Sequence, residues 1–179
     1  VQATLNDPHN QSSLTQLLSQ MEKAQHVYVT GGRLSGIIAA MLANKLRYLN
    51  LQVHDLSCGT VGDYIDQTTL VQPNDLVIAI SFPRYSKRMI DAARYASENG
   101  AHIVAVTDSV QSPLAEHADS VLTAKSDMVS FIDSLVAPLS LLNALVVSIV
   151  QKKQSELAST FDRLEKIWDA YEVYEKEDG

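Results

Sequence analysis

Residues 76–86 read LVIAISFPRYS, and this stretch decides the fold class. Its first five residues are all apolar, which is typical of a strand buried on both faces of a parallel sheet. The loop Ser81–Ser86 follows, and a helical pattern begins near Lys87. A loop between a buried strand and a helix start gathers free backbone N–H groups, here with hydroxyls and a guanidinium. The stretch therefore predicts an anion-binding site at the end of a central strand.

A second stretch of the same kind lies upstream, where residues 27–36 read VYVTGGRLSG. Residues 27–29 predict a short strand, and apolar residues from Leu34 to Leu49 recur at helical spacing. We expect the strand to end at Gly31 and Gly32, because glycine takes positive φ without steric cost. We interpret the two loops as neighbours that form one binding site.

Strand and helix patterns alternate along the rest of the chain. Further strands are expected at residues 51–56, 103–106 and 121–122, and further helices from Ser12 or Ser13, at 86–99 and at 131–153, with a weaker one at 64–70. This alternation implies right-handed crossovers and a parallel sheet with helices on both faces. For the strand order 2-1-3-4-5 a ligand binds between strands 1 and 3, and these are the strands that end in the two loops.

The composition limits the classes of function. At 179 residues with 46% hydrophobic content, the chain suits one domain with a sizeable core. The formal net charge of -7 argues against a nucleic-acid surface, because duplex binding needs clustered Lys and Arg. The single cysteine, Cys58, excludes an internal disulfide and favours a reducing cytoplasm. No apolar run approaches the roughly 20 residues that span a bilayer.

Hydroxyls and guanidinium groups are the main candidates for ligand binding. Ser35, Ser81 and Ser86 can hold a phosphate or carboxylate together with backbone donors, although capping of the helices is the alternative. Arg33 and Arg84 can each grip an anion bidentately, or be solvated, or pair with acidic neighbours.

Gly31 and Gly32 belong to the same candidate site, and His54 and Ser57, at the end of the second strand, are weaker candidates. The histidines show no metal-ligand spacing, so we expect no metal. Walker loops, dinucleotide-binding glycine patterns and catalytic Cys-His signatures are also missing from the sequence, so we expect no cofactor.

Four motifs, taken in order, resemble the sugar isomerase (SIS) domain. They are the Gly-rich loop with Ser35, the strand followed by Ser81-x-x-x-x-Ser86, VAVTDS at 104–109 and SPLA at 112–115. The sequence is most similar to the effector domain of RpiR-type (MurR/RpiR) bacterial transcription regulators, over roughly residues 14–150. The resemblance implies a flavodoxin-like three-layer αβα sandwich with a five-stranded parallel sheet that binds a phosphorylated sugar. It also implies an N-terminal helix-turn-helix domain that reads DNA and lies outside this chain.

On this basis residues 12–153 form the SIS domain. Residues 1–11, with the turn signature Asn6-Asp7-Pro8, form a linker or a remnant of the connection to the helix-turn-helix domain. Residues 154–179 contain an amphipathic helix with apolar residues three or four apart, namely Leu157, Phe161, Leu164, Trp168 and Tyr171. This stripe packs either on its own domain or on a second subunit.

The two loops depart from the usual SIS pattern. The first loop usually reads Gly-x-Gly-x-Ser, so Gly31 and Ser35 match while Arg33 replaces the second glycine. The second usually reads Ser-x-Ser-Gly-x-Thr, and here Pro83 and Arg84 replace the Ser-Gly pair. Pro83 removes a hydroxyl and an N–H donor from the phosphate cradle. A sugar phosphate is therefore the first expectation, and a sugar acid or another anion gripped by the arginines is the second.

Three functions are open. The first is a ligand-sensing domain that relays binding, through a dimer or tetramer, to DNA-binding domains. The second is a free-standing phosphosugar isomerase, which needs a catalytic base; Glu98 and Glu116 lie outside the loops, and His54 is a speculative candidate. The third is a degenerate SIS domain that serves for oligomerisation. We expect the first function, hence no catalytic residue and no membrane partner.

Overall fold

Five parallel strands form one sheet in the computed structural model, which describes residues 2–57, 66–125 and 134–174. Their order is β2-β1-β3-β4-β5, which confirms the predicted topology and places the brief fifth strand at an edge. The strands are β1 (Val27–Gly31), β2 (Val53–Asp55), β3 (Leu76–Ile80), β4 (His102–Thr107) and β5 (Ser120–Thr123).

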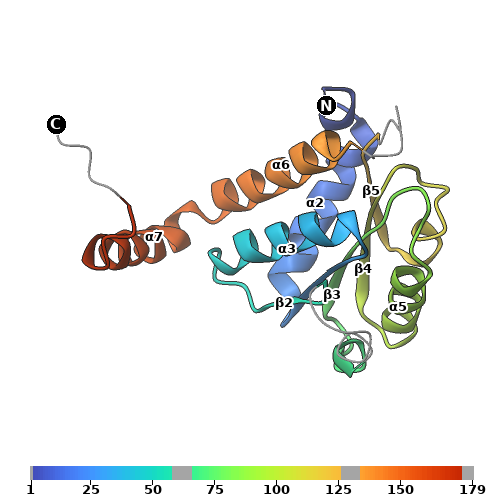
Figure 1. Ribbon diagram of the computed structural model, residues 1–179, viewed down its shortest axis with the longest axis horizontal. Helices are drawn as coiled ribbons and strands as arrows, with labels where there is room; N and C mark the ends of the chain where they lie inside the picture. The colour runs from blue at the N-terminus through green and yellow to red at the C-terminus, as the bar shows by residue number, and fades with distance from the viewer. Residues whose placement is uncertain (1, 58–65, 126–133, 175–179) are drawn as a thin grey trace.

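Helices cover both faces of the sheet, so the molecule is a three-layer αβα sandwich (Figure 1). The helices α2, α3 and α6 lie on one face, and α5 lies on the other (Figure 1). The helices are α1 (Gln2–Leu5), α2 (Pro8–Lys23), α3 (Leu34–Arg47), α5 (Lys87–Glu98), the 3-10 turn η1 (Ala115–His117), α6 (Val136–Lys152) and α7 (Gln154–Ala170).

The apolar core is split by the sheet because successive strand residues point to opposite faces. In β3, Leu76, Ile78 and Ile80 pack with α2, α3 and α6, whereas Val77 and Ala79 pack with α5. Strand β3 is buried at every position and lies in the middle of the sheet, so the prediction of a central strand from the apolar run at 76–80 is confirmed.

The N-terminal helix begins earlier than predicted. Helix α2 starts at Pro8, and the Asp7 side chain caps it by accepting a hydrogen bond of 2.9 Å from the His9 N–H. Proline suits the first helical position because its missing N–H has no partner there. The prediction of a helix start at Ser12 or Ser13 was therefore wrong, and Asn6-Asp7-Pro8 is the helix cap.

Other boundaries differ by a few residues. Strand β2 has three residues where 51–56 was predicted. The weaker helix at 64–70 and the helix expected from residue 131 fall partly on 58–65 and 126–133, which lie outside the described residues. Pro138 lies in the first turn of α6, where proline is tolerated.

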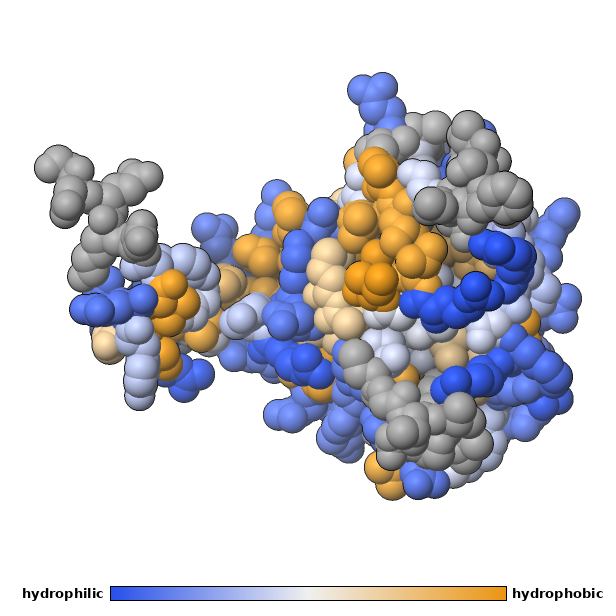
Figure 2. Space-filling view, viewed as in Figure 1, coloured by the Kyte–Doolittle hydropathy of each residue, from blue (hydrophilic) through white to orange (hydrophobic). Residues whose placement is uncertain are grey.

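Some large apolar side chains remain on the surface, over the beginnings of α3 and α6 (Figure 2). Among the described residues no single helix is long and apolar enough to cross a membrane; α6 and α7 meet that test only as a pair, bent by 102°.

Candidate functional site

The two predicted loops lie side by side at the carboxyl edge of the sheet. Strands β1 and β3 pair directly, with Gly31 opposite Ile80, so both loops leave the sheet at the same level. A Cβ atom placed on Gly32 would lie 3.1 Å from the Ser86 Oγ. The prediction that the loops are neighbours is confirmed.

Both loops line one pocket with a volume of about 80 Å³. Its lining includes six predicted site residues and three that the sequence did not single out for binding; the nine residues are Gly32, Arg33, Leu34, Ser35, Ser81, Phe82, Pro83, Arg84 and Ser86. Ser35 and Ser81 are buried, whereas both arginines are exposed. The pocket therefore has hydroxyls at its base and guanidinium groups at its mouth. Leu34 and Phe82 were missed because apolar residues in a loop carry no signal for a polar ligand.

Glycine has a different role from the one predicted. Positive φ falls on Arg33 (57°) and Arg84 (67°), and among the described glycines only on Gly100. Gly31 is needed for space, since a Cβ there would lie 2.5 Å from the Ser35 carbonyl oxygen. The absence of a side chain lets α3 start directly against the end of β1. The expectation that Gly31 and Gly32 supply positive φ was wrong.

Two helix N-termini point their backbone donors toward this pocket. Helix α3 begins after Arg33 and α5 begins after Ser86, and neither has an acidic residue in its first turn or a side-chain cap. No acidic residue in its own first turn therefore offsets the partial positive charge at either helix start. Ser86 occupies the N-cap position, but its hydroxyl makes no capping hydrogen bond.

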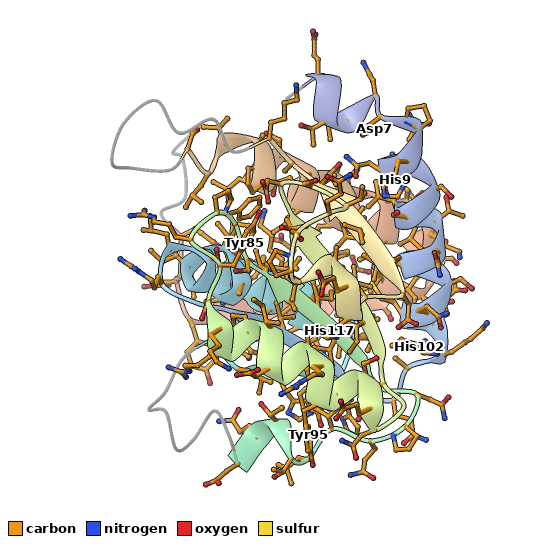
Figure 3. All side chains as sticks on the ribbon, turned by 90° about the vertical axis from the view of Figure 1, so that its right-hand side faces the viewer. Asp7, His9, Tyr85, Tyr95, His102 and His117 are labelled. Carbon is orange, nitrogen blue, oxygen red and sulfur yellow. The ribbon has the colours of Figure 1, made fainter. Side chains whose placement is uncertain are left out.

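The SFPRYS loop is held in place by its own polar groups. The Ser81 Oγ accepts a hydrogen bond of 3.3 Å from the Ser86 N–H, and the Ser81 N–H donates to the Val106 carbonyl at 3.1 Å. The Tyr85 hydroxyl reaches Asp108, at the end of β4. Burial, together with this hydrogen bond, raises the pKa of Tyr85 to about 12. Figure 3 shows Tyr85 beside the start of α5, at the opposite end of that helix from Tyr95.

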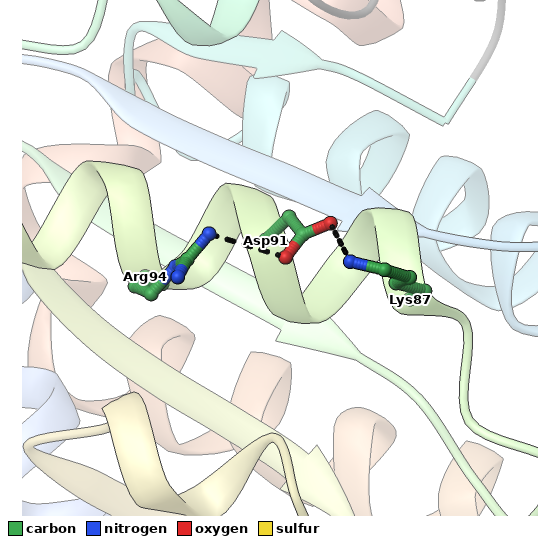
Figure 4. A network of polar contacts seen from close by, with 3 residues as sticks. All are labelled: Lys87, Asp91 and Arg94. Atoms are coloured by element: carbon green, nitrogen blue, oxygen red, sulfur yellow. Dashed lines mark hydrogen bonds and ion pairs between the residues drawn. The ribbon is translucent and has the colours of Figure 1, made fainter.

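The cations near the pocket are not equivalent. Lys87 pairs with Asp91 at 3.0 Å, and Asp91 also contacts Arg94 at 3.4 Å, so this network runs along the outside of α5 (Figure 4). The Arg33 side chain, by contrast, makes no hydrogen bond or ion pair within the ranges that the structure describes. Arg33 is therefore the cation best placed to receive an anion without first breaking an ion pair.

His54 and Ser57, the two weaker candidates for ligand binding, do not line the pocket. His54 stacks on Tyr28, with 4.7 Å between ring centroids, and its Nε2 lies 3.1 Å from the His26 Nδ1. Burial and the neighbouring His26 lower the pKa of His54. The backbone N–H and hydroxyl of Ser57 both donate to Asp55. These side chains are engaged in local contacts.

Acid–base groups are missing from the described lining of the pocket, which contains neither a carboxylate nor an imidazole. Glu98 is the last residue of the 12-residue helix α5, roughly 18 Å along its axis from the end that meets the pocket. Glu116 belongs to η1. The described residues also hold no group of three or more side chains that could bind a metal ion.

Three kinds of comparison point to one family. The family model for the SIS domain matches residues 20–148. An uncharacterised HTH-type transcriptional regulator of Haemophilus influenzae is 30% identical over 151 residues, which are 82% of this chain and 52% of that protein. The 3-hexulose-6-phosphate isomerase of Mycobacterium gastri is 31% identical over 106 residues, which are 59% of this chain and 50% of that protein. The chain thus spans about half the length of these two relatives.

Solved structures agree on the fold. The sugar isomerase domain of the RpiR transcription factor from Sphaerobacter thermophilus superposes with a TM-score of 0.85 at 27% identity, over 92% of this chain and 91% of that one. The Vibrio vulnificus NanR protein, complexed with ManNAc-6P, superposes with a TM-score of 0.76 over 95% of this chain and 64% of that one. Its identity is 19%, so that likeness concerns the fold alone.

Proposed function

The chain belongs to the SIS domain family, and from this membership we propose that it is the ligand-sensing domain of a transcriptional regulator. Its ligand is a phosphorylated sugar or a related anionic carbohydrate, bound between the ends of β1 and β3. The observation that carries the proposal is the convergence of two helix starts, neither with an acidic residue in its first turn, on a pocket lined by Ser35, Ser81 and Ser86.

The pocket offers three kinds of donor to one anionic group. Backbone N–H groups in the first turns of α3 and α5 supply donors of fixed direction. The hydroxyls of Ser35 and Ser81 add donors at its buried end, and the arginine side chains can close over a phosphate or carboxylate bidentately. Because Pro83 contributes no N–H, Arg33 and Arg84 supply positive charge where the usual family pattern supplies backbone N–H donors.

Similarity to regulators favours sensing over catalysis. The RpiR domain matches almost the whole chain, and a helix-turn-helix regulator is among the sequence relatives. In such an arrangement, the ligand shifts the equilibrium between subunit arrangements by its difference in affinity for them, and the DNA-binding domains read the shift.

Phosphosugar isomerisation is the second candidate, favoured by the two 3-hexulose-6-phosphate isomerases among the relatives. That reaction requires a base beside the carbon acid of the sugar. Since the described pocket lining carries no carboxylate or imidazole, the base would have to come from beyond this lining.

Thermal unfolding with a panel of sugar phosphates, sugar acids and inorganic phosphate tests the proposal. A ligand at about 100 times its Kd adds roughly 2.7 kcal/mol to the free energy of unfolding. For a chain of this size that corresponds to a rise in melting temperature of about 5–10 °C. Ser81→Ala and Arg84→Ala should abolish or reduce the rise, whereas the matched controls Ser97→Ala and Arg94→Ala, further along α5, should preserve it.

The outcomes of this experiment distinguish a ligand sensor, an isomerase and a domain that serves only for oligomerisation. A shift with one compound class, without turnover of that compound by NMR, supports a sensor. Turnover of a ketose phosphate would make the protein an isomerase. Equal shifts in the site variants and their controls, or no shift with any compound, would contradict ligand binding in this pocket.

A further inference from the structure

Two histidines meet where the edge strand β2 pairs with β1 (Figure 1). The His54 Nε2 lies 3.1 Å from the His26 Nδ1, and the two ring centroids are 5.1 Å apart. His54 belongs to β2 and is exposed, whereas His26 directly precedes β1 and is half-buried. The two residues are 28 positions apart in the sequence, so spacing along the chain gave no sign that their rings meet.

This histidine pair is separate from the candidate anion site. The pocket lies at the carboxyl end of β1, beyond Gly31, whereas His26 precedes the first residue of that strand. The five residues of β1 rise by about 16 Å. A ligand held by the two histidines is therefore not the ligand of the proposed function.

The spacing of the two nitrogens is close to that of two ligands of one metal ion. Nitrogens at zinc–nitrogen distances of about 2.0–2.1 Å lie about 3.3–3.4 Å apart around a tetrahedral ion and about 2.9 Å apart around an octahedral one. The observed 3.1 Å falls between these values. Without a metal, the same spacing is that of an N–H···N hydrogen bond with one proton between the nitrogens.

Both histidines are held in position by contacts that need no ligand. The His26 N–H donates to the Asp75 Oδ1 at 3.3 Å, and the His26 carbonyl accepts from the Leu76 N–H at 3.0 Å. His54 lies opposite Tyr28 in the strand pairing, and their rings stack with 4.7 Å between centroids and an interplanar angle of 19°. Ligands that are already positioned lose little conformational freedom when they bind.

Both facing nitrogens can present a lone pair at neutral pH. Imidazole binds metal ions in its neutral form, and burial together with the neighbouring His26 lowers the pKa of His54, which favours that form. The outer nitrogens, His26 Nε2 and His54 Nδ1, make no hydrogen bond to other described residues. Each ring can therefore carry its proton on the outer nitrogen.

We propose that His26 and His54 form a two-histidine site for one divalent transition-metal ion, of the kind that imidazole prefers, such as Zn²⁺, Ni²⁺ or Cu²⁺. The ion takes the place of the proton between the facing nitrogens. That proton moves through solvent to the outer nitrogen of its own ring, so both rings stay neutral and no proton is released. Water fills the remaining coordination positions, because the described residues supply no third ligand. The bound ion links the three-residue strand β2 to β1.

Isothermal titration calorimetry of the full chain with Zn²⁺ is the first test. It uses a Cys58→Ser background, because Cys58 is the only thiol and thiolates bind the same ions. One Zn²⁺ should bind per chain, and His26→Ala and His54→Ala should each raise the Kd by about tenfold or more, since each removes one of two ligands. The control is His102→Ala, because His102 also faces a possible ligand, Asp119, at 4.0 Å. This change should alter the Kd by less than about threefold.

NMR spectra of the histidine side chains distinguish direct coordination from a structural effect of the substitutions. In the Cys58→Ser protein, Zn²⁺ should shift the ring signals of His26 and His54 and leave those of the other three histidines in place. Mg²⁺, which prefers oxygen ligands, should shift neither.

Three results would each overturn the proposal. They are no binding at about 1 mM Zn²⁺, equal Kd values in the three alanine variants, and Zn²⁺-induced shifts confined to the other histidines. No sugar or phosphate takes part in these measurements, so their result is independent of the proposed function.

Discussion

The Tyr85 hydroxyl donates a 2.8 Å hydrogen bond to the Asp108 Oδ1 and so fastens the loop after β3 to the end of β4. The same carboxylate oxygen accepts a 3.1 Å hydrogen bond from the Thr107 hydroxyl. The loop that carries Ser81 and Arg84 is thus positioned by a neighbouring strand as well as by its own backbone.

Replacing Tyr85 with Phe should loosen this loop and lower stability at neutral pH by about 1 kcal/mol, the usual net contribution of one hydrogen bond. Ligand affinity should fall as well, because Arg84 would lose part of its preorganisation. Urea unfolding and calorimetric titration measure the two effects. Unchanged affinity in Tyr85→Phe would show that the loop holds its shape without Asp108.

The pH dependence of this contact follows from the pKa of Tyr85, which is raised from 10.0 to about 12 in the folded protein. Folding therefore favours the protonated phenol, and its stabilising contribution is fully present below pH 10. The contribution is lost as the pH rises from about 10 through about 12. The difference in unfolding free energy between wild type and Tyr85→Phe should shrink over this range, and a constant difference would contradict the assignment.

Arg33 should oppose stability while it supports binding. Its backbone has a φ of 57° and a ψ of -124°, a conformation that non-glycine residues seldom adopt. Arg33→Gly should relieve this strain and stabilise the fold by about 1 kcal/mol, after allowing for the greater chain entropy of glycine. The same change should weaken the binding of an anionic ligand. Loss of both stability and affinity would mean that the Arg33 side chain also supports the fold.

The contact between Gly32 and Ser86 can be tested by a suppressor pair. Gly32→Ala places a Cβ 3.1 Å from the Ser86 Cβ and Oγ, so it should push the two loops apart and cost about 1–3 kcal/mol. Adding Ser86→Gly removes the obstructing side chain and should restore most of the stability, because glycine is tolerated at a helix N-cap. Additive losses in the double variant would show that the loops do not press on each other.

Asn10 joins the N-terminal helix to the edge of the sheet. Its amide donates to the Thr4 and Thr123 carbonyls at 2.8 and 2.7 Å and accepts from the Thr123 N–H at 2.7 Å, and the residue is 1% exposed. Asn10→Ala should cost about 3 kcal/mol, because it leaves the buried Thr4 carbonyl and the half-buried N–H and carbonyl of Thr123 without their partner. Gln11→Ala, at an exposed neighbouring position, is the control. Equal melting temperatures for the two variants would contradict this role of residues 1–11 in the fold.

Local patterns in the chain were sufficient for the fold class, the strand order and the position of the candidate site. The apolar run at 76–80 identified β3, and the two loops after β1 and β3 marked the switch point of the sheet. These inferences succeed because burial on both faces and chain crossover leave strong, short-range signals. Asp7-Pro8 also fits the sequence pattern of a helix N-cap, but we interpreted these residues as part of a linker.

Tertiary packing alone decided which backbone bears the strain and which side chains meet. Positive φ falls on Arg33 and Arg84 rather than on Gly31 and Gly32, and Gly31 is needed instead for space at the start of α3. His54 contacts His26 through its ring nitrogen and stacks on Tyr28. Tyr85 donates a hydrogen bond to Asp108, 23 residues away in the sequence. Contacts between residues distant in sequence depend on how strands and helices pack, and periodicity along the chain does not encode these contacts.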